Sequence, residues 1–363
     1  MNNQSTNLSI QLQFLKDPTC MTLSDYAEQW LTIYAAKHLE RTSYIRYEQV
    51  IHYNILPYLG DMSISEIKPY HLECFFSTLS EQDLRYDGHT GGYSHGTLCK
   101  IKTVLSSMFS TAVQWELIEH NPCSKIKLPK RTDIKSIKCY TAEQMKSFIE
   151  FLYDIYSCSN AMQYQYLVLY LIAIYGGLRR GELLGLTWEK VDYTTGTIYI
   201  NQTINRVDGS YLIKSPKTKS SVRIVTLPLS VMNILRIYQI KQDNYRIQMA
   251  DGWQGNNWLF IQKNGTNMSI GTPYAKFRQL IKLYNQQTNA TIYLPELGLH
   301  SLRHTNASLL ISSNLVDAQT VAHKLGHSNV TTTMKYYIHA YEENERKTAA
   351  VLEEVLHLPG SNI

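Results

Sequence analysis

The residues best suited to chemistry are arginines, histidines, a lysine and two tyrosines in the second half of the 363-residue chain. In "GGLRRGELL", Arg179 and Glu182 are three residues apart, and in "HSLRHTNAS" the same spacing separates His300 and Arg303. Residues three apart share one face of a helix, so a carboxylate there can orient a guanidinium. Two arginines beside a histidine can surround a phosphate, because a guanidinium fork matches its oxygens. Ordinary surface ion pairs are the simpler alternative.

A lysine and two tyrosines extend this set. Lys217, in "SPKTKSSVRIV", would lie near the tip of a hairpin between two predicted strands, with Lys214 and Lys219 as alternatives. The stretch "LGHSNVTTTMKYYIH" ends in Tyr336 and Tyr337, either of which could be a nucleophile or a packing residue. A phenol with a pKa of about 10 attacks poorly at neutral pH, but nearby cations favour its ionised form.

Two histidine pairs raise the possibility of a metal site. His300 and His304 are four residues apart, as are His323 and His327, and such pairs can bind zinc. Neither pair contains the glutamate of an H-E-x-x-H motif. We therefore expect no metal and no other cofactor.

The first half of the chain reads as a helical bundle. A polar tail at residues 1–20 precedes residues 21–120, which carry four helical patterns and no strand signal. The predicted helices begin near Thr22, Thr42, Lys68 and Thr97. Thr22 and Asp25 form a variant of the capping box.

Residues 121–139 form a basic segment with six lysines and arginines against one aspartate. Two prolines and the lack of a helical stripe predict an extended interdomain linker. The candidates for DNA contact are Lys125, Lys127, Lys130 and Arg131. A solvated spacer is the alternative, since charge runs usually face water.

Residues 140–340 predict a mixed α+β domain, followed by a tail helix at 341–363. Runs at 197–200, 211–214 and 222–227, separated by turn residues, predict a three-stranded antiparallel meander. The apolar run 164–175 is shorter than the roughly 20 residues that span a bilayer, so it reads as a buried helix. The expected fold is therefore mainly α, a helical bundle followed by a domain with one small sheet.

The composition fits a folded intracellular protein. Hydrophobic residues make up 44% and charged residues 18%. The six cysteines form no C-x-x-C motif, and no signal peptide is visible, so we expect reduced thiols in a cytoplasm. A net charge of +5 is compatible with a polyanionic partner.

The motifs occur in one chain order: "GLRRGELLGLTW", "PKTKSSVRIVTLP", "HSLRHTNAS" and "LGHSNVTTTMKYYIH". This chain resembles the tyrosine recombinase, or phage integrase, family. The segments "TLSDYAEQWL", "ILPYLGDMSISEI" and "WELIEHNP" look like that family's core-binding domain, so the resemblance spans about residues 21–345. The sequences of these motifs are most similar to those of integrases of phages and integrative conjugative elements of Gram-positive bacteria.

The resemblance implies roles for individual residues. Arg179 and Arg303 match the arginines that bind the non-bridging oxygens of the scissile phosphate. Lys217 matches the lysine that protonates the leaving 5′ oxygen. His300 matches the histidine that assists proton removal, and His327 matches a second histidine that hydrogen-bonds the phosphate.

The resemblance also assigns Glu182 as the support of the first arginine and selects the nucleophile. In the family, the attacking tyrosine is commonly followed two residues later by a histidine. Only Tyr337 has that histidine, His339, so we predict Tyr337 as the nucleophile and Tyr336 as a packing neighbour. No cofactor is implied.

The implied function is integration and excision of a mobile element by cleaving and rejoining double-stranded DNA at attachment sites. The implied assembly is a homotetramer on two DNA sites, with the tail 341–363 docking in trans. An excisionase and a host DNA-bending protein are further candidate partners. The implied location of the protein is the cytoplasm, at the bacterial nucleoid, and no membrane partner is implied. The start of the first helix at Thr22 leaves accessory arm-site binding in doubt.

Three alternatives stay open. A chromosome-dimer-resolving recombinase would share the same residues. A non-catalytic DNA-binding regulator should lack one of the six catalytic positions, and all six are present. A zinc-dependent hydrolase would contain bound metal.

Overall fold

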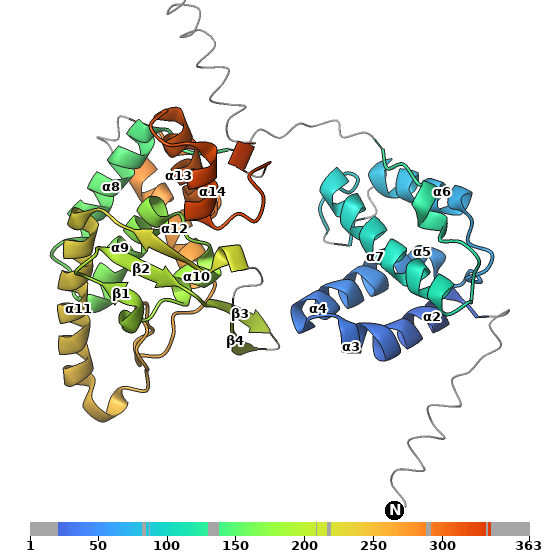
Figure 1. Ribbon diagram of the computed structural model, residues 1–363, viewed down its shortest axis with the longest axis horizontal. Coiled ribbons are helices and arrows are strands. Elements are labelled where there is room, and N and C mark those ends of the chain that lie inside the picture. Colours follow the sequence, from blue (N-terminus) through green and yellow to red (C-terminus); the bar gives the residue numbers. More distant parts are fainter. Residues whose placement is uncertain are drawn as a thin grey trace, which may run out of the picture. The chain divides into compact units, whose positions relative to one another are not determined.

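The computed structural model divides into two compact units, Met1–Lys135 and Ser136–Ile363 (Figure 1). The structure describes residues 21–81, 85–86, 88–129, 138–207, 209–215, 219–287, 292–331 and 333–334.

The first unit is built from helices, as predicted. In chain order its α-helices are α2 (Leu23–Gln29), α3 (Ala36–His38), α4 (Arg41–Val50), α5 (Leu56–Leu59), α6 (Pro69–Glu81) and α7 (His95–Gln114). Two π-helical turns, Trp30–Ala35 and Ile51–Ile55, connect α2 with α3 and α4 with α5. The Thr22 hydroxyl accepts a hydrogen bond from the Asp25 backbone N–H at 3.1 Å, which confirms the predicted cap.

Aromatic side chains fill the core of this bundle. Tyr26, Trp30, Phe76 and Phe109 are fully buried. The Tyr26 hydroxyl donates to the Met108 carbonyl at 2.6 Å, so its polar tip is satisfied inside the core.

The predicted linker differs from the structure over its first six residues. The Asn121 side chain caps a short 3₁₀ helix, Pro122–Lys125, by accepting from the Cys123 N–H at 2.9 Å. Cys123 and Ile126 are buried in the core of the first unit. The extended linker is therefore wrong for residues 121–126, because these apolar side chains dock while Lys125 between them faces water. Residues 130–137 lie outside the described residues.

The described residues of the second unit form two small antiparallel sheets (Figure 1). One has the order β1 (Val191–Asp192), β2 (Thr197–Ile200) and β5 (Arg223–Thr226). The other is a hairpin of β3 (Thr203–Val207) and β4 (Ser210–Lys214).

The predicted meander is therefore wrong in its pairing, although a three-stranded sheet is present. β2 pairs directly with β5, and β4 pairs with β3, a strand that the prediction missed. Ile198, Ile200 and Val225 face the core, whereas β4 is exposed or half-buried along its length. Burial of that apolar face selects β5 as the partner of β2.

The helices of the second unit surround α9 (Ala161–Gly176), which is buried on nearly every side. The others are α8 (Ala142–Tyr156), α10 (Arg180–Leu184), α11 (Leu229–Met249), α12 (Thr272–Asn285), α13 (Ser301–Ser312) and α14 (Ala318–Leu325). The predominantly helical fold class is thus confirmed. Among the described helices, none combines the length and apolar character needed to cross a bilayer.

Candidate active site

The turn that follows α9 positions Arg179 in the site. α9 terminates at Gly177, whose φ of +62° is a left-handed conformation that favours glycine. From α13, Asn306 Nδ2 donates to the Ile174 carbonyl at 2.7 Å, and Arg303 Nη1 donates to the Gly177 carbonyl at 2.7 Å. Because α13 holds this turn, the next residues reach the start of α10 with Arg179 as its N-cap.

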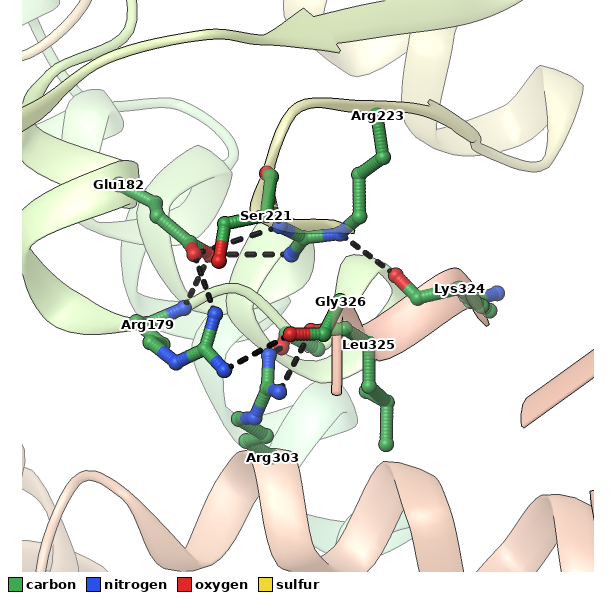
Figure 2. A network of polar contacts seen from close by, with 9 residues as sticks. Arg179, Glu182, Ser221, Arg223, Arg303, Lys324, Leu325 and Gly326 are labelled. Carbon is green, nitrogen blue, oxygen red and sulfur yellow. Dashed lines mark hydrogen bonds and ion pairs between the residues drawn. The ribbon is translucent and has the colours of Figure 1, made fainter. Parts of the chain in front are cut away.

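Glu182 lies between two guanidinium groups (Figure 2). Its Oε1 accepts from Arg179 Nη1 at 2.7 Å, and its Oε2 accepts from the Arg179 backbone N–H at 2.9 Å. Arg223, at the start of β5, donates Nη2 to Oε2 at 2.9 Å and Nη1 to Oε1 at 3.3 Å. The predicted contact between Arg179 and Glu182 is present, with a second arginine on the other side of the carboxylate.

The Glu182 carboxylate is held in its ionised form. Burial acts to raise its pKa, but the hydrogen bonds and charge of Arg223, together with the hydrogen bonds from Arg179, outweigh burial and lower the pKa below its usual range. Its side chain is 4% exposed, so the two arginines and not water provide its counter-charge.

Three arginines bind three consecutive carbonyls at the end of α14 (Figure 2). The pairs are Arg223 Nε to Lys324 O at 2.7 Å, Arg303 Nη2 to Leu325 O at 2.5 Å, and Arg179 Nη2 to Gly326 O at 3.0 Å. The last carbonyls of a helix lack intrahelical partners and carry its negative partial charge. The arginines therefore fix the end of α14 from three directions.

The cluster has an excess of positive charge. Three guanidiniums surround one carboxylate, and the Arg179 side chain is 39% exposed, whereas Arg303 is buried. An anion that reaches this surface would find a charge-assisted, preoriented binding site. Phosphate is a suitable anion because its geometry matches the guanidinium fork.

His300 lies immediately before α13, at its N-cap position. The surrounding protein displaces water from its ring, and the positive charges of Arg303 and Arg179 add to this effect, so its pKa is lowered. The rings of His300 and His304 meet edge to face with centroids 4.5 Å apart. Burial and the charges of His300 and Arg303 lower the pKa of His304 to about 4. Both histidines are therefore neutral at pH 7, and a neutral imidazole can accept a proton.

His327 follows the left-handed Gly326 that ends α14. Its Nδ1 is 2.8 Å from the hydroxyl of Thr333, a fully buried residue, so the ring has a fixed orientation. Burial, followed by the charges of Arg303 and Arg179, lowers the pKa of His327 to about 4.

Within the described ranges, no three histidine, cysteine, aspartate or glutamate residues gather closely enough to hold a metal ion.

The structure brings together five of the predicted site residues, Arg179, Glu182, His300, Arg303 and His327. Lys217, Tyr336 and Tyr337 lie outside the described residues. The predicted hairpin around Lys217 is wrong, because the flanking strands β4 and β5 belong to different sheets.

Two of the four candidate DNA contacts are among the described residues. Lys125 and Lys127 are exposed, and Lys130 and Arg131 lie outside the described residues.

Sequence reasoning missed Arg223. The available signal was alternation in "VRIVT", where Val225 points inward and Ile224 and Thr226 point outward. Alternation places Arg223 on the inward face with Val225. An arginine at such a position needs buried partners.

Comparisons with known proteins agree with this geometry. The sequence matches the family described as "Phage integrase family" over residues 138–344. The chain belongs to the phage integrase family. Residues 22–80 match the "Phage integrase, N-terminal SAM-like domain". The chain is thus a tyrosine-type site-specific recombinase, as its motifs predicted.

Named relatives support the same assignment. The chain is 28% identical to the ICEBs1 integrase of Bacillus subtilis (strain 168) over 267 residues, which cover 73% of this chain and 67% of the relative. It is 25% identical over 353 residues to a XerC-like tyrosine recombinase of Caldanaerobacter subterraneus subsp. tengcongensis, covering 92% and 83%.

A solved structure shares the fold. The Tn1549 transposon integrase in complex with transposon right end DNA has a TM-score of 0.70 and 24% identity, covering 90% of this chain and 99% of that chain.

Proposed function

We propose that this protein integrates and excises a mobile element by cleaving and rejoining double-stranded DNA through a 3′-phosphotyrosine intermediate. The observation that carries the proposal is the arginine cluster around Glu182, with neutral His300 and His327 beside it. Such a cluster supplies what phosphoryl transfer chiefly requires, which is charge neutralisation and positioning.

In the proposed reaction, Arg179 and Arg303 bind the non-bridging oxygens of the scissile phosphate. The Tyr337 oxygen attacks phosphorus, and its proton passes to His300. The bond between phosphorus and the 5′ oxygen breaks, and Lys217 donates a proton to that oxygen. The products are a 3′-phosphotyrosine and a free 5′-hydroxyl. Attack by the 5′-hydroxyl of another strand reverses these steps and joins the two DNAs.

The protonation states of the histidines support these roles. A lowered pKa leaves His300 neutral at pH 7, ready to accept the tyrosine proton. His327 is neutral as well. In the tautomer where its Nδ1 accepts from the Thr333 hydroxyl, Nε2 carries a hydrogen and can donate to a phosphate oxygen.

The partner is double-stranded DNA at recombination sites. Its support is family membership together with the site's positive charge. The homotetramer, the excisionase, the host DNA-bending protein and a cytoplasmic, nucleoid-associated location stay predictions.

Chromosome-dimer resolution is the second candidate, supported by the match to a XerC-like recombinase over 92% of the chain. Sequencing the DNA that becomes covalently attached in the host distinguishes the two functions. Attachment sites of a mobile element support integration, whereas a single chromosomal site outside any mobile element supports resolution.

The test of the chemistry uses a nicked suicide substrate, which releases a short strand after cleavage and traps the covalent complex. We expect Tyr337→Phe to abolish covalent attachment and leave DNA binding nearly unchanged, because only a hydroxyl is lost. The matched control, Tyr336→Phe, should still cleave. Covalent product from Tyr337→Phe would show that the nucleophile is another residue.

A further inference from the structure

Arg223 is a buried arginine that the proposed chemistry does not use. Its side chain is 0% exposed. It donates to both oxygens of Glu182, to the Lys324 carbonyl and to the Ser221 carbonyl at 3.1 Å (Figure 2). A guanidinium is this deeply buried only when its charge and its donors are matched.

These contacts join three segments of the site. Glu182 lies on α10, three residues after Arg179. Lys324 lies in the last turn of α14, three residues before His327. Ser221 ends the short 3₁₀ helix Lys219–Ser221, which follows the segment containing Lys217. Arg223 therefore contacts the partner of Arg179 and the helix end that precedes His327, two groups to which the proposed reaction assigns roles.

The charge of Arg223 also affects how strongly Arg179 can bind a phosphate. Glu182 binds both arginines, so its single negative charge is shared between them. Without Arg223, Arg179 alone would compensate the carboxylate. The Glu182 carboxylate, 2.7 Å from Arg179 Nη1, would then compete with an incoming phosphate for Arg179 and weaken that interaction.

The contact to α14 has a geometric effect. Arg223 holds Lys324 O while Arg303 holds Leu325 O and Arg179 holds Gly326 O. Removing one of three adjacent anchors would let the end of α14 shift. His327 follows directly, so its ring would move relative to the phosphate.

We propose that Arg223 is a positioning residue for phosphate cleavage, which compensates Glu182 and anchors the end of α14 so that Arg179 and His327 face the scissile phosphate. This inference rests on the proposed function.

The test compares cleavage of two DNA substrates by the same preparation of full-length protein. One carries the ordinary phosphate at the cleavage position mapped by trapping. The other carries a methylphosphonate there, in which a methyl group replaces a non-bridging oxygen and removes the negative charge. The ratio of the two rates does not depend on the fraction of active protein.

The variant is Arg223→Lys, which keeps the positive charge but cannot bridge Glu182 and the Lys324 carbonyl together. We expect its rate on the ordinary phosphate to fall on the order of 10²-fold, as for a small misplacement of reacting groups. We expect a much smaller loss on the methylphosphonate, because that substrate lacks one of the oxygens that the displaced Arg179 and His327 would bind. Arg236→Lys is the matched control, since Arg236 lies on α11 over the ring of Tyr193, and its ratio should equal that of the unaltered protein.

Glu182→Asp is the second variant, in case Arg223→Lys does not fold. It keeps the carboxylate but moves it away from Arg223. The rate on the ordinary phosphate, divided by the rate on the methylphosphonate, should therefore fall as it does for Arg223→Lys. Equal losses on both substrates, or no loss on either, would overturn the role of Arg223. Absence of covalent product from the unaltered protein would instead overturn the proposed function, so the two failures are distinguishable.

Discussion

Replacing Glu182 by glutamine tests whether the arginine cluster depends on one buried charge. The amide keeps the shape of the carboxylate but removes its charge and turns one acceptor oxygen into a donor. Arg223, fully buried, would face this amide with no counter-charge, whereas Arg179 is 39% exposed and partly compensated by water. The expected damage therefore comes mainly from Arg223.

The magnitude follows from that burial. Breaking a buried ion pair by removing one partner costs about 3–5 kcal/mol, because the remaining charge is buried without compensation. Since Glu182 also accepts the Arg179 backbone N–H, a value near the upper half of that range is expected. For a unit of this size, each kcal/mol lowers Tm by about 2–4 °C, so the Tm should fall by about 8–20 °C.

The pH dependence provides a second readout. The pKa of Glu182 is lower in the folded protein than its ordinary value of 4.5. Its stabilisation is therefore fully present above about pH 4.5 and is lost as the pH falls through the folded-state pKa. The difference in stability between the unaltered protein and Glu182→Gln should be largest at pH 7 and shrink below about pH 4.5.

The assay is thermal unfolding of both proteins at several pH values, with Glu189→Gln as the control. Glu189 is exposed and pairs with Lys190 at 3.4 Å, so its loss should change stability by less than about 1 kcal/mol. Equal stability of Glu182→Gln and the unaltered protein, or a deficit that does not change with pH, would refute the reasoning.

Three further predictions follow from the proposed function. Cleavage should persist in excess EDTA, because arginines and histidines supply the positive charge; activity lost to EDTA and restored by a divalent ion would contradict this. Neutralising Lys125, Lys127 and Lys130 should weaken binding to all DNA sequences alike and flatten the salt dependence by up to about 0.9 of a slope unit per lost phosphate contact. An unchanged slope would leave these lysines as a solvated surface. Truncation after Glu345 should leave a folded protein that binds one site but assembles poorly, as measured by light scattering on synaptic DNA; tetramers equal to those of the full chain would show that the tail packs within its own subunit.

Local features of the fold were predictable from the sequence. Thr22 and Thr141 mark the starts of the helices that they cap, because a hydroxyl at that position accepts a hydrogen bond from a backbone N–H of the first turn. The three-residue spacing of Arg179 and Glu182 predicted their contact, although the structure makes it as a capping box: Arg179 is the N-cap of α10, and Glu182 at the third helical position reaches back to it. The motifs also identified the family, which the comparisons confirm.

Features that depend on long-range packing were not predictable in the same way. The order of the strands depends on which pairing buries Ile198 and Val225, and the strand pattern alone does not state this. Likewise, two prolines and the lack of a helical stripe predicted an extended linker at residues 121–139, whereas the apolar Cys123 and Ile126 dock against a core formed by distant helices.

The site shows the same division. The types and spacing of Arg179, Glu182, His300 and Arg303 were determined by the sequence alone. Only the tertiary structure decided that Arg223 shares Glu182 and that three arginines bind consecutive carbonyls at the end of α14. The physical reason is that a helix sets the geometry of its own neighbours through backbone hydrogen bonds, whereas buried charges from separate segments meet only once the core has folded around them.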